Sequence, residues 1–221
     1  MNFDFDFFVS IFPKLILKIP NTLWLGCIAF SIALVLGLFL EICHSCRFRI
    51  LRWMAGLYIS YFRSTPYIMQ LFIFYFGLPQ VIPIMRNIVG ETALIITIAM
   101  NSAAFIAEII RGGLLAVDKE QKEAALSIGL SSFRTYTEII LPQAFVAAFP
   151  ALGNSFISMV KNTAIGFTIG VIDLLAQAKI LAASSLNFFE AYIAVGIIYW
   201  IVLVVIERLL RYIETKISRY L

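Results

Sequence analysis

Residues 118–142 read DKEQKEAALSIGLSSFRTYTEIILP and lie in the longest stretch without a long apolar run, 111–142. Asp118 can cap a helix, and Gln121 three residues later completes a capping box. Residues 119–128 are good helix formers, and Gly129 ends the helix as a C-terminal glycine does. Ten helical residues measure about 15 Å, which is too short to cross a membrane. Because one face of this rod is apolar, we expect it to dock on another surface.

A second short helix is expected directly after this one. Ser131 or Ser132 can begin it, and it should end near Pro142, because the residue before a proline avoids helical geometry. The loop 111–142 is therefore predicted to be ordered structure.

The flanking sequence is strongly apolar. Hydrophobic residues make up 62% of the 221 residues and charged residues 14%, and the mean hydropathy is +0.95. A helix needs about 20 apolar residues to cross the hydrocarbon core. The chain is therefore predicted to be an all-α membrane protein, with one domain over 1–221 and five transmembrane helices. The five segments are 22–40, 53–78, 92–110, 144–171 and 188–206, of which the fourth is interrupted by Pro150, Gly153, Asn154 and Lys161.

Basic residues predict the orientation, because lysine and arginine gather in cytoplasmic loops. If the 41–52 loop, the 111–142 loop and the C-terminal tail share one side, that side carries 11 basic residues and the other carries 4. The 11 are Arg47, Arg49, Arg52, Arg111, Lys119, Lys122, Arg134, Arg208, Arg211, Lys216 and Arg219, and the 4 are Lys14, Lys18, Arg86 and Lys179. This bias predicts an outside N-terminus and a cytoplasmic C-terminus. It also explains the net charge of +4 without a nucleic-acid partner.

Several function classes lack the residues they would need. The first residues are acidic and aromatic, so no signal peptide is expected and the first span should be retained. Cys43 and Cys46 form a C-x-x-C, but a zinc site needs further ligands, and only His44 and Cys27 remain. We read the cysteines as reduced thiols and predict no metal site. A small membrane enzyme would need clustered catalytic groups, which one histidine does not supply.

A set of motifs follows one order along the chain. Glu123-Ala124-Ala125, Gly129, Ile139 and Leu141-Pro142 fit the pattern E-A-A-x3-G-x9-I-x-L-P. Around it stand Arg63-Ser64-Thr65-Pro66, Ala107-Glu108-Ile109-Ile110-Arg111-Gly112-Gly113, Leu141-Pro142-Gln143-Ala144, and Asn154 to Thr163. In these motifs the chain resembles the membrane subunits of bacterial ABC importers, most closely those of the polar amino-acid uptake branch. The resemblance runs from about residue 20 to about 210. Glu120 departs from the family pattern at the helix start, which is expected to be tighter or more acidic than in relatives. Ser64 and Ala164 also depart from the pattern, in fine detail only.

The resemblance implies a type I ABC importer fold, in which the 119–128 helix couples the membrane subunit to a cytoplasmic ATPase dimer. Its coupling residues would be Gln121, Glu123, Ala124, Ala125, Gly129, Leu141 and Pro142. The chain has no G-x-x-x-x-G-K-[ST], so ATP and Mg²⁺ would be bound by the ATPase, and this chain would be no enzyme. A binding protein would deliver the solute outside the bacterial inner membrane. The second permease subunit would be an identical chain by default, or else a close relative.

Polar residues inside spans are costly and mark candidates for the solute pathway. Asn154, Ser158 and Lys161 are spaced by four and three and should share a face. Lys161 could meet a solute carboxylate or pair with Glu108. Asn101 could bond a neighbouring helix or the solute. Arg63 could snorkel, form an ion pair or touch the solute, and Glu108 could pair with Arg111 or act at a gate.

Within the amino-acid branch, residues 152–163 and the Leu-Pro after the second span look most like cystine permeases. L-Cystine is therefore the predicted solute. The alternative function is a stand-alone secondary carrier or channel. That reading predicts inverted repeats, which we do not find, and gives the ordered loop no role.

Overall fold

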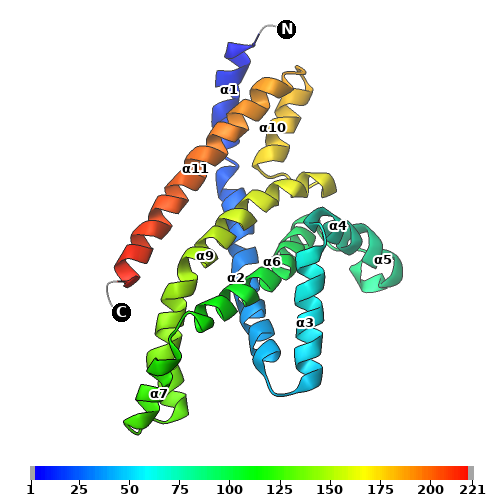
Figure 1. The fold of residues 1–221 in the computed structure, drawn as a ribbon. Coiled ribbons are helices and arrows are strands. Elements are labelled where there is room, and N and C mark those ends of the chain that lie inside the picture. Colours follow the sequence, from blue (N-terminus) through cyan, green and yellow to red (C-terminus); the bar gives the residue numbers. More distant parts are fainter. Residues whose placement is uncertain (1–2, 219–221) are drawn as a thin grey trace.

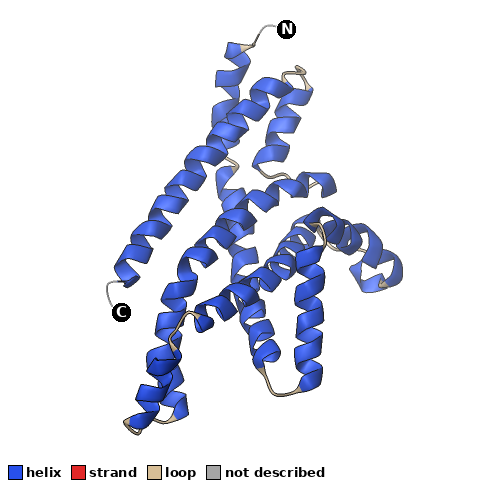
Figure 2. Ribbon diagram, in the orientation of Figure 1, coloured by secondary structure: helices blue, strands red, loops and turns tan. Residues whose placement is uncertain are grey.

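A computed structural model describes residues 3–218, which are helical and contain no strand (Figures 1 and 2). The predicted all-α class is confirmed. The long helices are α2 (Ile19–Ser45), α3 (Arg49–Ser64), α6 (Gly90–Leu115), α9 (Leu141–Asn162) and α11 (Phe188–Ile217). The shorter ones are α1 (Phe5–Ile16), α4 (Tyr67–Phe72), α5 (Leu78–Val81), α7 (Lys119–Ser127), α8 (Ser132–Arg134) and α10 (Leu174–Ala183). Short π or 3-10 segments are η1 (Ile73–Gly77), η2 (Pro83–Met85), η3 (Thr135–Ile140) and η4 (Thr163–Ile169).

The core lies where α2, α6 and α9 cross near the middle of the molecule (Figure 1). Small side chains, among them Ala29, Ala33 and Ala99, are fully or almost fully buried there. Helices in lipid gain little from the hydrophobic effect when they associate, so close backbone approach through small residues supplies the van der Waals packing. A second cluster joins α1, α10 and α11 at the end of the molecule that carries the N-terminus.

Four helical segments in residues 3–218 are long and apolar enough to cross a membrane, and they match four of the five predicted spans. They are Ile19–Ser45, Gly90–Leu115, Ser132–Ile169 and Phe188–Ile217.

The second predicted span, 53–78, differs because its helix breaks. The 16-residue α3 ends at Ser64, Thr65 and Pro66 are extended, and α4 begins at Tyr67. Proline lacks the N–H that a continuous helix would need at this point.

The expected helix end near Pro142 is wrong. The chain continues as one helical rod from Ser132 to Ile169, through α8, η3, α9 and η4. Pro142 directly follows the π segment η3, which ends at Ile140, so the rod departs from regular α geometry where it accommodates the proline. Residues 132–142 of the predicted loop are therefore the first part of a membrane-length helix.

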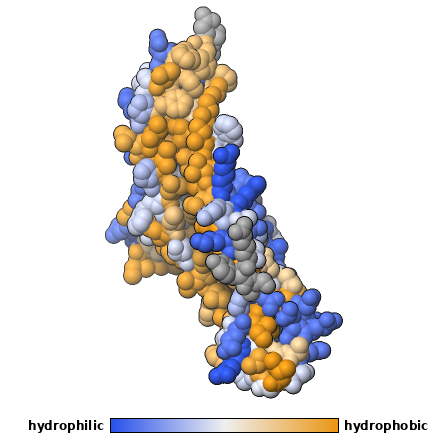
Figure 3. Space-filling view, turned by 90° about the vertical axis from the view of Figure 1, so that its left-hand side faces the viewer, coloured by the Kyte–Doolittle hydropathy of each residue, from blue (hydrophilic) through white to orange (hydrophobic). Residues whose placement is uncertain are grey.

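The two ends of the molecule differ in composition. The α2–α3 turn and α7 lie at the lower end in Figure 1, opposite the N-terminus. Figure 3 shows a predominantly apolar body above a lower lobe of mixed character. Arg219, which entered the charge count, lies outside the described residues.

Candidate functional site

The first candidate site is a lobe formed by residues 116–143, which projects from the lower end of the bundle (Figure 1). Its helix α7 spans Lys119–Ser127, as predicted to within one residue. Gly129 ends it with φ +87°, Leu130 N donates to Ala125 O over 3.2 Å, and Gly129 N donates to Leu126 O over 3.0 Å. These two bonds form the Schellman motif, which requires a left-handed residue at the position of Gly129.

The predicted capping box is only half correct. Asp118 is the N-cap residue, but its side chain accepts no capping hydrogen bond, and Gln121 N donates instead to the main-chain oxygen of Asp118 over 3.1 Å. The extended N-cap backbone thus closes the first turn without the carboxylate. The second helix does begin as expected, because Ser131 caps it through Arg134 N.

Contacts inside the lobe fix α7 against η3 and α9. Lys122 Nζ donates to Tyr136 Oη over 3.2 Å and lies 5.0 Å from the centre of its ring. Gln143 Nε2 reaches Gln121 Oε1 at 3.5 Å. Ala125 is 3% exposed, whereas Ala124 faces outward. The two alanines therefore have different positions, one packed inside the lobe and one on its surface.

The outer surface of the lobe carries apolar side chains without cover. We call Leu126, Ile128, Phe133 and Tyr136 the lobe patch; Ile128 is 79% and Phe133 76% exposed. Figure 3 shows apolar residues among hydrophilic ones at this lower end. Glu123 and Leu141 are also exposed, and the Glu123 carboxylate makes no hydrogen bond or ion pair within residues 3–218. An exposed apolar cluster rimmed by polar groups is the usual mark of a protein-binding surface.

The second candidate site is a cleft between α6 and α9 with a volume of about 340 Å³. Nine residues line it: Asn101, Ser102, Phe105, Ile109, Ala151, Asn154, Ser155, Ser158 and Asn162. Three of these, Asn101, Asn154 and Ser158, were predicted for the pathway, and the structure brings them together. Each of the six polar side chains is an uncharged amide or hydroxyl. The cleft can therefore offer both donors and acceptors without a formal charge.

Asn101 also ties the cleft to the break between α3 and α4. Its Nδ2 donates to the main-chain oxygen of Phe62 and to Gln70 Oε1, both over 3.0 Å. Gln70 Nε2 donates to the same Phe62 oxygen over 3.1 Å and to Thr65 Oγ1 over 2.7 Å. The predicted alternative that Asn101 bonds a neighbouring helix is thus correct, and its side chain lines the cleft as well.

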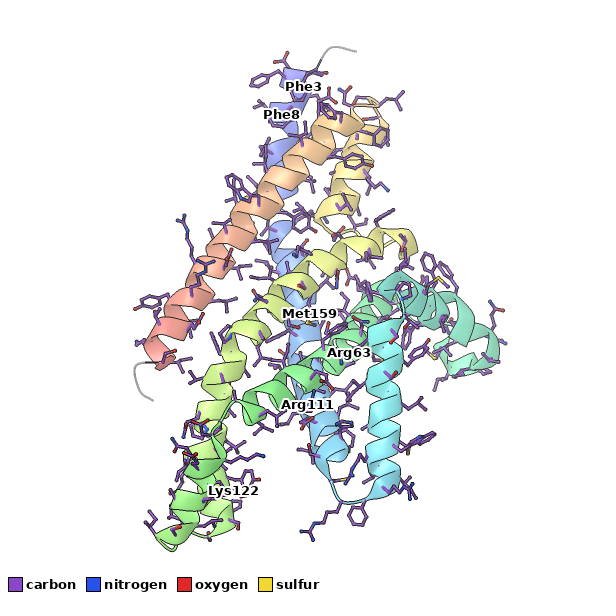
Figure 4. All side chains as sticks on the ribbon, viewed as in Figure 1. Phe3, Phe8, Arg63, Arg111, Lys122 and Met159 are labelled. Carbon is purple, nitrogen blue, oxygen red and sulfur yellow. The ribbon has the colours of Figure 1, made fainter. Side chains whose placement is uncertain are left out.

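The charged candidates Arg63, Glu108 and Arg111 form a separate ion-pair cluster, and Figure 4 labels its two arginines. Arg111 donates to Glu108 Oε2 through Nη2 over 2.7 Å and Nε over 3.2 Å, which confirms the predicted pair. Arg63 Nη1 lies 3.8 Å from the same oxygen. Its guanidinium also lies 5.8 Å from the ring centre of Phe105, which lines the cleft. Arg63 therefore joins an ion-pair cluster at the end of α3.

Of the predicted pathway residues, Lys161, Arg63 and Glu108 do not line the cleft. Lys161 is exposed and forms no ion pair with Glu108, whose partners are Arg63 and Arg111. At about 100° per residue, the centre of the cleft face of α9 runs through 151, 155, 158 and 162, and Lys161 lies at its edge, about 20° from Asn154 two turns earlier. Ser155, Asn162 and Phe105 were missed. The serine–asparagine spacing of 155, 158 and 162 was the signal available.

Comparisons with known proteins agree with these features. Residues 33–219 match the family model described as binding-protein-dependent transport system inner membrane component. The probable amino-acid permease protein YxeN of Bacillus subtilis (strain 168) is 41% identical over 98% of this chain and 96% of its own length. The L-cystine transport system permease protein TcyL of the same organism is 39% identical over 98% and 92%. A solved structure described as an amino acid ABC transporter with histidines superposes with a TM-score of 0.91, at 37% identity, over 98% of this chain and all of that one.

Proposed function

Since this chain belongs to the family of binding-protein-dependent transport system inner membrane components, and is the non-enzymatic permease subunit of an amino-acid ABC importer, we propose that its solute is L-cystine. The proposal of cystine is supported by the 39% identity to TcyL over nearly the whole chain. It also agrees with the resemblance of residues 152–163 to cystine permeases. The permease subunit would be a single domain over 1–221, with its N-terminus outside the inner membrane and its C-terminus in the cytoplasm.

The lobe patch carries the proposal for how energy reaches the membrane. A cytoplasmic ATPase would cover Leu126, Ile128 and Phe133, and the exposed Glu123 would meet a donor of that partner by a charge-assisted hydrogen bond. Because α7 contacts Tyr136 and Gln143 in the rod Ser132–Ile169, a movement of α7 would be transmitted through these contacts to α9. ATP and Mg²⁺ would be bound by the ATPase dimer.

The cleft is the proposed place where the solute passes this subunit. Asn101, Asn154 and Ser158 would exchange hydrogen bonds with a polar solute in a region where lipid offers none. A binding protein would deliver the solute from outside, and a second copy of this chain would complete the membrane assembly. Both are partners that the family implies; the identity of the second permease chain is our proposal.

Reconstitution into liposomes tests the function. The permease, its ATPase and its binding protein are assembled, and uptake of radiolabelled L-cystine, L-glutamine and L-arginine is measured with ATP inside. We expect ATP-dependent uptake with cystine preferred, and its loss in Glu123→Lys, with Glu138→Lys as a matched exposed-carboxylate control on the same lobe. Preference for glutamine or arginine would overturn cystine alone. Uptake driven by a proton or sodium gradient without ATP would instead establish a secondary carrier.

A further inference from the structure

Two cysteines lie where α2 turns into α3, away from the lobe and the cleft. Cys43 is in the last turn of α2, and Cys46 is the C-cap residue of that helix. Both carry free thiols, and the thiol of Cys46 donates to the main-chain oxygen of Phe48 over 3.6 Å. Each side chain is half-buried, so a small solute can reach it. The function proposed above gives this C-x-x-C pair no role.

The helix places the two cysteines within reach of each other. Residues 44 and 45 are helical, so the Cα atoms of Cys43 and Cys46 have the helical separation for three residues, about 5 Å. A disulfide needs a Cα separation of about 4.4–6.8 Å. The Cβ atoms at this spacing are about 1–2 Å too far apart for a disulfide. Cys46 can supply that movement, because its backbone leaves the helix with ψ 162° and enters a bend.

The surroundings of the pair are basic. Arg47, Arg49 and Arg52 are exposed, and none of them forms an ion pair within residues 3–218. Arg52 donates to the main-chain oxygen of Cys46 through Nη2 over 2.7 Å and through Nε over 3.2 Å. A local excess of positive charge raises the rate at which anions meet a site. An anionic disulfide is therefore favoured over a cationic one as a reactant of Cys46.

We infer that Cys43 and Cys46 form a reversible dithiol–disulfide site on the cytoplasmic side of the membrane, and that small anionic disulfides of the glutathione type oxidise it. This inference goes beyond the proposed function and shares with it only the cytoplasmic placement of the α2–α3 turn. Cytoplasmic thiols are kept reduced, so the pair is a dithiol at rest and a disulfide under oxidation. Because closing the disulfide moves Cys46, it disturbs the two hydrogen bonds from Arg52 that join the turn to the start of α3.

The exchange takes two steps. The Cys46 thiolate attacks one sulfur of the small disulfide, a bond to Cys46 Sγ forms, and the other half leaves as a thiolate that takes up the proton lost by Cys46. The Cys43 thiolate then attacks Cys46 Sγ, and the second half leaves with the proton of Cys43. Two protein thiols are oxidised, and one small disulfide is reduced to two thiols. Cys46 attacks first because it lies in the turn, whereas Cys43 packs against the buried residues Leu40, Ala55 and Ile59.

Counting free thiols tests the inference. The permease–ATPase complex, with Cys27→Ser in the permease, is placed in phosphatidylcholine nanodiscs and incubated with glutathione disulfide. Remaining thiols are labelled with N-ethylmaleimide, and the intact mass of the permease is measured. The parent should lose both labels and carry no glutathione, and excess reduced glutathione should restore both labels. Two labels retained by the parent, or a stable glutathione adduct on it, would overturn the inference.

Single variants test the order of the two steps. Cys43→Ser should stop at a glutathione adduct on Cys46, because no second thiol is present to displace it. Cys46→Ser should react about tenfold or more slowly, since its remaining thiol packs against the core. Equal rates for the two variants would overturn the assignment of Cys46 as the attacking thiol.

The charge of the oxidant gives an independent measurement. The rate with glutathione disulfide is divided by the rate with cystamine, a cationic disulfide. This ratio should fall about threefold or more in Arg47→Gln/Arg49→Gln and on addition of salt. The matched control Arg208→Gln/Lys216→Gln removes two exposed basic residues near the C-terminal end of α11 and should keep the parent's ratio. An unchanged ratio in Arg47→Gln/Arg49→Gln would overturn the preference for anionic disulfides.

Membrane vesicles test the side on which the site lies. Glutathione disulfide does not cross the membrane, so it should oxidise the pair in inside-out vesicles and leave it reduced in right-side-out vesicles. The opposite result would overturn the cytoplasmic placement. No solute is transported in any of these measurements, so failure of L-cystine as the solute is recognised separately, in the liposome assay.

Discussion

The side-chain amide of Asn101 on α6 donates a hydrogen bond over 3.0 Å to the main-chain oxygen of Phe62 on α3. In a continuous helix that oxygen would accept from the N–H of residue 66, and Pro66 has none. Gln70 donates to the same oxygen from α4, so two amides replace the missing helical bond. In lipid an unsatisfied carbonyl is costly, because no water is present to bond it. The break beside Arg63 is thus held in place by side chains from α4 and α6.

Replacing Gln70 should therefore destabilise the fold. Gln70 is 5% exposed. Gln70→Leu leaves the Phe62 oxygen with Asn101 as its one side-chain donor, and removes the hydrogen bonds from Gln70 Nε2 to the main-chain oxygen and the hydroxyl of Thr65. We expect a loss of about 1–3 kcal/mol in unfolding free energy, seen as a lower midpoint of thermal unfolding in detergent. Gln80→Leu is the matched control, because Gln80 is exposed and donates only within its own turn, to Phe76 O over 2.9 Å. Equal midpoints for the two variants would refute this account.

Two adjacent glycines at the root of the lobe should behave differently. A Cβ on Gly113 would lie 2.5 Å from the main-chain oxygen of Ala144 and 2.9 Å from Cβ of Ala148, so α6 and α9 would have to separate. A Cβ on Gly112 meets nothing within 4 Å. Gly113→Ala should cost about 1–3 kcal/mol by overpacking, whereas Gly112→Ala should be neutral or stabilising because alanine favours the helix. Thermal midpoints of the purified variants decide it, and the reverse order would show that the crossing of α6 and α9 is looser than described.

Features set by local sequence were predictable. Helix α7 and its end at Gly129 follow from short-range propensity and from the one residue type that adopts positive φ without strain. Four membrane spans follow from apolar runs long enough to cross the hydrocarbon core.

Features that depend on neighbours in space were not predictable. The 53–78 run is long and mostly apolar, which predicts one span although it contains Arg63 and Pro66. The break at Pro66 is stabilised by Gln70 and Asn101, which bond the freed oxygen, and sequence alone does not show these partners. Likewise Lys161 and Ser158 are only three residues apart. Which of them faces α6 depends on the rotation of α9, and this is fixed by packing rather than by local sequence.

Gly129 should tolerate only residues that accept a left-handed backbone. Its φ of +87° is favourable for glycine, tolerable for asparagine and strained for a β-branched residue. Gly129→Asn should leave the complex with the ATPase intact, whereas Gly129→Val should cost about 1–2 kcal/mol or more and displace α7 from η3. The measurement is the amount of ATPase that co-purifies with the permease. No steric conflict confuses the comparison, because a Cβ at this position meets nothing within 4 Å. Normal co-purification of Gly129→Val would mean that the Schellman motif is not needed for docking.

The lobe patch should contribute to binding the ATPase through burial of apolar area. Phe133 is 76% exposed in this chain, and burying a phenylalanine side chain contributes about 1.5–3 kcal/mol. Phe133→Glu should therefore weaken association about tenfold or more, whereas Phe133→Leu, which keeps an apolar side chain, should lose far less. Thermal unfolding of the permease alone should be unchanged in both variants, because the side chain touches solvent rather than the core. Association is measured by titrating labelled ATPase onto permease in nanodiscs. If Phe133→Glu binds as tightly as the parent, the ATPase contacts a different face of the lobe, and the exposed apolar side chains must be covered by something else.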